Sequence, residues 1–119
     1  MGTELTEIKE IIEKEILLKN AKNLLTTGTE TLASGTNVQL SFKVTKGYKA
    51  FITKIEVSNI PNTSYIIRVN SLISWINELI PYKPEPVDED SPIIIDISNA
   101  GTSTEVYDYV IQGYEISKK

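Results

Sequence analysis

The sequence predicts a mainly β protein, an antiparallel β-sandwich preceded by one N-terminal amphipathic helix, and three observations support this fold class. Alternation of apolar and polar residues, typical of a strand with one buried face, places Val38, Leu40, Phe42 and Val44 on one side. Lys46-Gly47 then supplies a tight turn into a second strand-like run, so we expect residues 36–58 to form an antiparallel hairpin at the centre of the fold. About seven short strand-like runs with turns at close intervals are typical of a sandwich, and the 18 isoleucines favour a β-rich core.

The N-terminal residues 3–25 predict a helix. Thr3 is a suitable N-cap, and acidic residues occupy the first turn, where they favour the helix dipole. Within an arc of roughly 160° on a helical projection lie six apolar side chains, Leu5, Ile8, Ile11, Ile12, Ile16 and Leu18. Two interpretations stay open: the stripe packs on the sheet of its own chain, or it serves oligomerisation or docking. The expected organisation is therefore a helix over residues 1–25 and a β-sandwich domain over residues 26–119.

The remaining chain divides into strands and loops by the same patterns. Further strands are expected at residues 29–33, 65–70, 92–98 and 105–116, the last with a bulge at Gly113. Residues 71–80 fit a helical turn about as well as a kinked strand, and Pro81 ends them. The proline-rich, acidic residues 82–90 predict an exposed loop.

Composition excludes several classes of function. A net charge of -4 argues against nucleic-acid binding, which needs a basic face, and no apolar run approaches the roughly 20 residues of a membrane-spanning helix. The N-terminus lacks the pattern of a secretory signal. The absence of cysteine and histidine removes disulfides, thiolate nucleophiles, the commonest general base and the commonest metal ligand. We therefore expect no enzyme activity, no cofactor and no metal site.

Two groups of residues are candidate sites. The acidic residues of 85–90 could hold a calcium ion, but their spacing matches no EF-hand, and a solvated loop is the favoured interpretation. Among the aromatics, Trp75 and Tyr82 are the best candidates for a ligand- or partner-binding surface, because they flank the proline-rich loop. Tyr107 and Tyr109 share a face of the last strand with Ile111, which favours the core or a subunit interface.

Three stretches carry a resemblance to a known class of protein. They are FKVTKGYKAFITKIEVS, SPIIIDISNAGTST and YDYVIQGYEI, which combine strands with Lys-Gly and Asn-Ala-Gly turns. In this order they resemble small jelly-roll modules of virion accessory proteins, such as spikes, decoration proteins and receptor-binding tips. The resemblance covers about two-thirds of the chain and implies a jelly-roll-like sandwich that assembles into oligomers, often trimers, on a virion surface.

The function that follows from the resemblance is a non-enzymatic structural or host-attachment protein of a virus-like particle. Its expected partners are further copies of itself and other virion or surface proteins. The alternative is a carbohydrate- or protein-binding β-sandwich module that uses the exposed aromatics, with a glycan as one candidate ligand.

Overall fold

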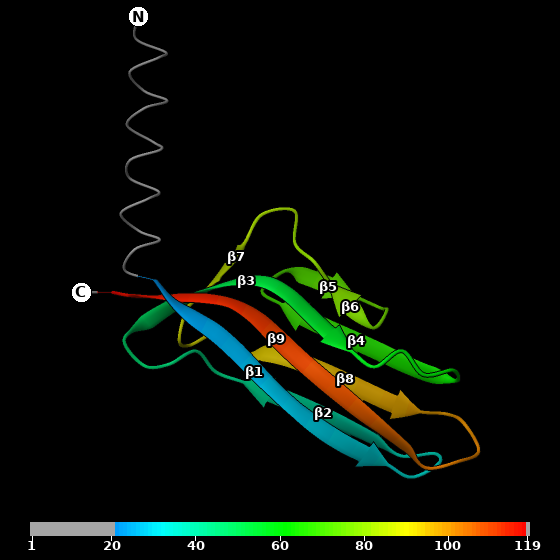
Figure 1. The fold of residues 1–119 in the computed structure, drawn as a ribbon. Coiled ribbons are helices and arrows are strands. Elements are labelled where there is room, and N and C mark those ends of the chain that lie inside the picture. The colour runs from blue at the N-terminus through cyan, green and yellow to red at the C-terminus, as the bar shows by residue number, and fades with distance from the viewer. Residues whose placement is uncertain (1–20, 119) are drawn as a thin grey trace, which may run out of the picture.

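A computed structural model describes residues 21–118 as nine β-strands in two antiparallel sheets (Figure 1). The strands are β1 (Ala21–Leu32), β2 (Asn37–Phe42), β3 (Tyr48–Val57), β4 (Thr63–Val69), β5 (Leu72–Ser74), β6 (Glu78–Leu79), β7 (Glu85–Val87), β8 (Ile93–Asn99) and β9 (Glu105–Ser117). The prediction of a mainly β chain with antiparallel sheets is confirmed. No helix long and apolar enough to cross a membrane occurs in this part of the chain.

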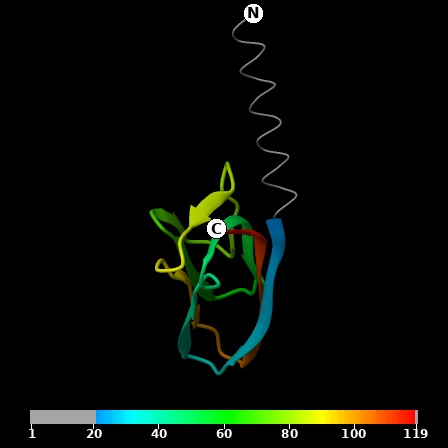
Figure 2. The same ribbon diagram turned by 90° about the vertical axis from the view of Figure 1, so that its left-hand side faces the viewer.

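The chain crosses repeatedly between the two sheets, although β4 and β5 lie together in one sheet and β6 and β7 in the other. Sheet A has the order β1-β9-β3-β6, and β7 also pairs with β3; sheet B has the order β2-β8-β4-β5. β6 pairs with Ile55 and Glu56, whereas β7 pairs with residues 50–52 of the same strand. The outer edge of sheet A beside β3 is thus built from two short pieces with a projecting loop between them. Figure 2 shows the two sheets as facing layers.

One hydrophobic core lies between the sheets. Sheet A contributes Ala50, Ile52, Ile55, Val57, Tyr107 and Ile111, and sheet B contributes Tyr65, Ile67, Val69, Ile93, Ile95 and Ile97. Within β4 and β8 the buried residues alternate strictly with more exposed ones, as expected for strands that bury one face. Both layers therefore depend on the same apolar contacts.

The predicted hairpin over residues 36–58 is wrong, although both of its strands exist. β2 pairs with β8, for example Leu40 opposite Ile95, and β3 pairs with β9. The connection between them carries the chain from sheet B to sheet A and buries Val44 on the way. Each strand has a single apolar face, and placing the two in opposite sheets buries both faces against one core.

The predicted boundary of the N-terminal helix is also wrong. Residues 21–25 form the start of β1, which pairs with β9 from Ala21 opposite Ile116 to Leu32 opposite Glu105. Leu24 packs against the core, and the threonine-rich continuation favours a strand. The register with β9 overrides the local helical pattern here. Residues 1–20, which hold the stripe from Leu5 to Leu18, lie outside the described residues.

Four later predictions have mixed outcomes. The strands expected at 65–70, 92–98 and 105–116 are confirmed as β4, β8 and β9. A bulge does lie at Gly113, but the extra residue is Thr53 on β3, where the register shifts between Ile52 and Lys54. The 82–90 loop is not wholly exposed, since it contains β7 with Val87 buried. Residues 71–80 form neither a helix nor one strand, because β5 and β6 join different sheets.

Candidate functional site

The segment that leaves β5 and enters β7 carries a concentration of exposed apolar side chains. Of the seven large apolar side chains exposed in the described residues, five fall within ten positions, namely Ile73 (48%), Trp75 (69%), Ile76 (59%), Ile80 (59%) and Tyr82 (99%). We call these five residues the apolar edge. Scattered exposed apolar residues are ordinary on protein surfaces, whereas a contiguous cluster marks an interaction site.

Trp75 and Ile76 sit on a turn that hydrogen bonds hold in one shape. The Ser74 hydroxyl donates to the Glu78 carbonyl at 2.6 Å and closes the turn across its base. Asn77 fixes the turn to β3: its side-chain amide donates to the Val57 carbonyl at 3.0 Å, and the Val57 N–H donates to the Asn77 carbonyl at 2.7 Å. The turn is therefore ordered before any partner arrives, which lowers the entropy cost of binding.

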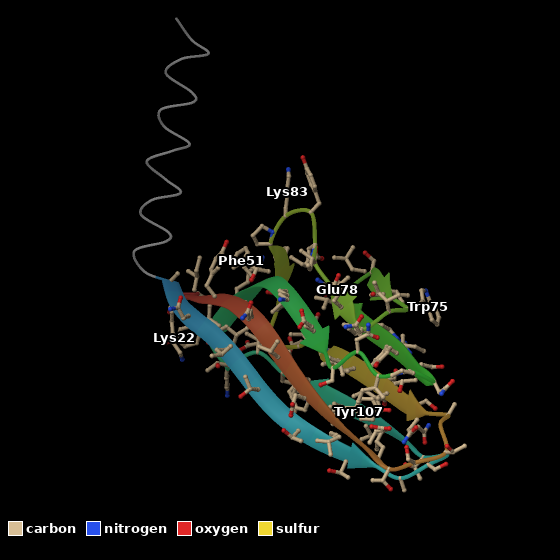
Figure 3. The ribbon with its side chains drawn as sticks, turned by 45° about the vertical axis from the view of Figure 1, so that its right-hand side comes forward. Lys22, Phe51, Trp75, Glu78, Lys83 and Tyr107 are labelled. Atoms are coloured by element: carbon tan, nitrogen blue, oxygen red, sulfur yellow. The ribbon has the colours of Figure 1, made fainter. Side chains whose placement is uncertain are left out.

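Tyr82 lies on the loop that projects between β6 and β7. Figure 1 shows this loop standing clear of both sheets, and Figure 3 places Lys83 near its tip and Trp75 at a separate point of the same side of the molecule. Pro81 and Pro84 restrict the backbone on both sides of Tyr82. The returning strand is tied down by Asn70, whose amide donates to the Pro86 carbonyl at 2.7 Å.

The remaining aromatics serve the fold. Tyr107 is fully buried and shares a 2.7 Å hydrogen bond between its hydroxyl and that of Thr63. The Tyr65 hydroxyl donates to the Ser58 carbonyl at 2.7 Å and accepts from the Ile60 N–H. Tyr109 packs against the core, with its ring centroid 5.4 Å from that of Phe42. The structure thus confirms the core placement expected for Tyr107 and Ile111.

The sequence singles out Trp75 and Tyr82 as candidate binding residues but does not single out the three exposed isoleucines near them in the chain. Ile73, Ile76 and Ile80 belong to a run that fits either a helix or a strand, and both of those patterns predict burial of half of its apolar residues. The signal that could have identified them is the number of apolar residues in this segment. Residues 72–82 hold more apolar side chains than strands of three and two residues can turn inward, so some of them must be exposed.

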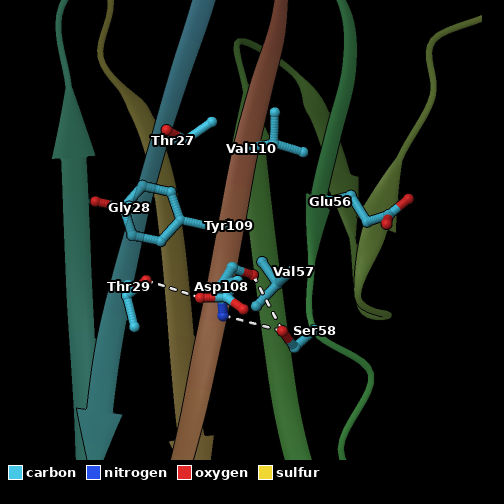
Figure 4. Close-up of a pocket in the computed structure, with 9 residues that line it drawn as sticks. All are labelled: Thr27, Gly28, Thr29, Glu56, Val57, Ser58, Asp108, Tyr109 and Val110. Atoms are coloured by element: carbon cyan, nitrogen blue, oxygen red, sulfur yellow. Dashed lines mark hydrogen bonds between the residues drawn. The ribbon is translucent and has the colours of Figure 1, made fainter.

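A second candidate is a shallow depression of about 410 Å³ on the outward face of sheet A (Figure 4). Its polar groups bond to one another: the Thr29 hydroxyl donates to the Asp108 carboxylate at 2.7 Å, and the Asp108 N–H donates to the Ser58 hydroxyl at 2.9 Å. Glu56 forms an ion pair with Lys54 at 2.9 Å. The first two contacts link β1 to β9 and β9 to the residue that follows β3, so the polar groups of the depression already have partners within the sheet.

Gly28, one of the residues that line the depression, is glycine for a steric reason on the inner face of sheet A. Gly28 pairs directly with Tyr109, and a Cβ at this position would collide with the tyrosine ring and hydroxyl. The ring therefore covers the backbone of β1 where another residue would place its own side chain. We interpret this part of the molecule as cross-strand packing, not as a ligand site.

The acidic loop forms hydrogen bonds and ion pairs with its own chain. The Gly47 N–H donates to the Glu89 carboxylate at 2.5 Å, and Lys118 lies 3.6 Å from Glu89 and 3.7 Å from Asp88. The Gly47 N–H, followed by the charge of Lys118, lowers the pKa of Glu89 below its usual value. Asp96 lies 3.6 Å from Arg68 on the outward side of sheet B. No group of three acidic residues in residues 21–118 is arranged to hold a metal ion.

Comparisons with known proteins show a distant structural likeness and no sequence match. No protein-family model matches the chain, and no curated protein sequence matches it. Among solved structures, the chain is similar to PliG of Aeromonas hydrophila, described as a periplasmic lysozyme inhibitor of g-type lysozyme. The two share 9% sequence identity over 80% of this chain and 89% of PliG, with a TM-score of 0.41. At that distance the likeness transfers neither a partner nor an activity.

The comparisons correct the predicted function. The prediction of a structural or attachment protein of a virus-like particle is not upheld, because the solved structure to which the chain is similar is a periplasmic lysozyme inhibitor and not a viral structural protein. The virion location and the trimer that were expected with that function have no support from the comparisons. The residues of the resemblance describe strands and turns, and such features recur in proteins of unrelated function.

Proposed function

We propose that this protein is a non-enzymatic binding module whose apolar edge docks a protein partner. One observation carries the proposal: five large apolar side chains are exposed within ten positions of the chain, a segment that includes a hydrogen-bonded turn and a proline-flanked loop. Tryptophan and tyrosine supply the largest contact area at the lowest entropy cost and dominate the energetics of protein interfaces. Burying Trp75 and Tyr82 against a partner would remove from water the two most exposed large apolar side chains of residues 21–118.

The neighbours of the aromatics favour a protein over a carbohydrate. Sugar recognition needs hydrogen-bonding groups beside the stacking ring, to replace the water lost from hydroxyls. The two exposed residues nearest Trp75 along the chain are Ile73 and Ile76, which offer no donor or acceptor on their side chains; Arg68, opposite Ile73 on β4, is the exposed polar residue beside them. A mixed aromatic and aliphatic cluster matches the core of a protein interface.

We also propose that the fold is a jelly-roll-like β-sandwich. Its support is the strand order, because the chain passes from sheet to sheet between β1, β2, β3 and β4 and again on the way to β8 and β9. Two sheets built by such crossings are the arrangement of double-sheet jelly rolls. In this arrangement the apolar edge closes one side of the sandwich, between the edge strand of sheet B and the interrupted edge of sheet A.

The test begins with position-specific crosslinking. A photo-reactive phenylalanine derivative replaces Tyr82 in the full chain, and in a matched protein it replaces Val106, an exposed apolar residue on β9 outside the apolar edge. A protein crosslinked from position 82 and not from position 106 is identified by mass spectrometry, purified and titrated calorimetrically. Trp75→Ala is then expected to weaken binding by at least about 2 kcal/mol, roughly thirtyfold in Kd.

Matched variants decide the result. Tyr82→Ala is expected to weaken binding of the purified partner, whereas Val106→Ala is expected to change its Kd less than twofold. Equal weakening by Val106→Ala would overturn the proposal, as would binding of the purified partner that Trp75→Ala leaves unchanged. Glycan-array binding that Trp75→Ala abolishes, without any protein partner at position 82, would assign the apolar edge to carbohydrate instead.

A further inference from the structure

The edge of sheet A opposite the apolar edge is a long strand with one free side. β1 runs for twelve residues and is the terminal strand of the order β1-β9-β3-β6. Along its other side no strand pairs with it among residues 21–118. Natural edge strands are commonly short or interrupted by proline or a bulge, since a free edge is a template for another strand. β1 contains no proline, and its pairing with β9 is continuous from Ala21 to Leu32.

Symmetric pairing of β1 with a second copy permits few registers. When two identical strands pair antiparallel about a twofold axis, each residue lies opposite a residue of the other copy, and the two residue numbers add to the same sum all along the pair. This sum is even, because only alternate residues direct their hydrogen bonds to the free side. Sums of 52 and 54 use almost the whole strand, pairing residues 21–31 in the first case and 22–32 in the second. All other even sums shorten the overlap.

Charge selects between these two registers. With a sum of 52, Lys22 of each copy lies opposite Glu30 of the other, so the pairing creates two complementary contacts. With a sum of 54, Lys22 faces Leu32 and Glu30 faces Leu24, which leaves both charges beside apolar side chains. Glu30 is half-buried and forms no hydrogen bond or ion pair with any described residue. Opposite charges directly across strands are stabilising, whereas an unmatched charge at an edge opposes pairing.

An exposed leucine supports the same register. Leu25 is 65% exposed on the outward face of β1. With a sum of 52 it lies opposite Thr27 of the second copy and diagonal to the second Leu25, so both leucines are covered at the centre of the contact. Lys22 reaches Glu115 at 3.7 Å within its own chain, and its ammonium group keeps further donors for a second carboxylate.

We propose that a second copy of this chain pairs with the free side of β1, centred on Thr26, to form one continuous sheet across a twofold dimer. Each copy then contributes β3, β9 and β1 to that sheet, and the two apolar edges lie at its far ends. Partner binding at two such ends raises the effective affinity for a bivalent or surface-bound target. The dimer stands on β1 alone and does not depend on what the apolar edge binds.

The natural absence of cysteine allows a direct test of the register. In Thr26→Cys the two introduced thiols lie directly opposite, about 4.5 to 5.5 Å apart between Cα atoms, which is within the range of a disulfide. In Thr27→Cys the equivalent residues are diagonal, about 7 to 8 Å apart. Under mild oxidation of the full chain we expect a covalent dimer from Thr26→Cys and at most a tenth of that rate from Thr27→Cys.

Charge reversal supplies an independent readout. Light scattering after size exclusion is expected to give a dimer for the unmodified full chain, and sedimentation is expected to show at least a tenfold higher dimer Kd for Glu30→Lys. Glu78→Lys makes the same charge change at the opposite edge of sheet A (Figure 3) and is expected to leave the dimer Kd within twofold. Thermal melts of both variants establish that the chain stays folded.

Three results would overturn the proposal. A monomer or a trimer at high protein concentration is incompatible with twofold pairing of β1. Faster crosslinking of Thr27→Cys than of Thr26→Cys assigns the alternative register with a sum of 54. A dimer that Glu30→Lys and Glu78→Lys weaken equally is held by some other surface.

Discussion

At the scale of single residues, the polar side chains that determine the shape of this molecule do so by reaching backbone groups far away in the sequence. Glu89 is the clearest case, because its carboxylate accepts the N–H of Gly47, a residue with a positive φ of 84° between β2 and β3. Only the deprotonated carboxylate also attracts Lys118, which lies 3.6 Å away. The ionised form of Glu89 is therefore favoured by the folded state.

That preference gives a pH dependence of stability. The pKa of Glu89 is lowered on folding, so its contribution is present at pH values above the unfolded-state pKa of 4.5 and is lost as the pH falls through the lower folded-state pKa. We expect Glu89→Gln to lower the urea midpoint at pH 7, and we expect the difference from the unmodified chain to shrink as the pH falls below 4.5.

The neighbouring carboxylate provides the control. Asp90→Asn, on the exposed side of the same loop, is expected to change the midpoint less than Glu89→Gln at pH 7. A difference between Glu89→Gln and the unmodified chain that stays constant from pH 7 to pH 3 would contradict the role of the ionised form.

At the scale of elements, the loop from β8 to β9 is held against the end of β1 by one buried amide. Asn99 is almost fully buried; its side-chain amide donates to the carbonyls of Leu32 and Ser103, and its side-chain carbonyl accepts the N–H of Gly101. This single side chain joins the ends of strands from both sheets, so its full set of bonds must be kept or replaced together.

Asn99→Leu is therefore expected to destabilise the fold by about 2 to 4 kcal/mol, since it leaves buried backbone groups without partners. Urea unfolding measures the loss in the free energy of unfolding. Thr102→Ala, an exposed change in the same loop, serves as the control and is expected to cost less than about 0.5 kcal/mol. A loss for Asn99→Leu as small as that of the control would show that the backbone groups find other partners.

At the scale of the whole molecule, the two sheets are stable only as a pair, because each buries its apolar face against the other. Ile95 of sheet B and Ile55 of sheet A are both fully buried in the shared core. Ile95→Ala is expected to cost about 2 to 5 kcal/mol and to increase amide hydrogen exchange in β3 and β9 as well as in β8. Increased exchange confined to sheet B would show that the sheets unfold separately.

The amino-acid pattern by itself determined the strand content of this protein and the inward face of most strands. Alternation in β9 correctly assigned Tyr107 and Ile111 to one buried face, because side-chain direction in a strand has a period of two residues wherever the strand lies. The sequence also singled out Trp75 and Tyr82, because they flank the proline-rich loop, and both are exposed in the structure.

Strand pairing and the ends of elements were decided only by the tertiary structure. The alternation of apolar and polar residues predicts that β2 and β3 each have one apolar face. It does not predict whether the two strands lie side by side in one sheet or face each other across a core. Likewise residues 21–25 and Val87 take their strand conformation from β9 and β3, which are distant in sequence. Such contacts outweigh local preference, because burying apolar surface contributes more free energy than the few tenths of a kcal/mol by which most residues differ in helix propensity.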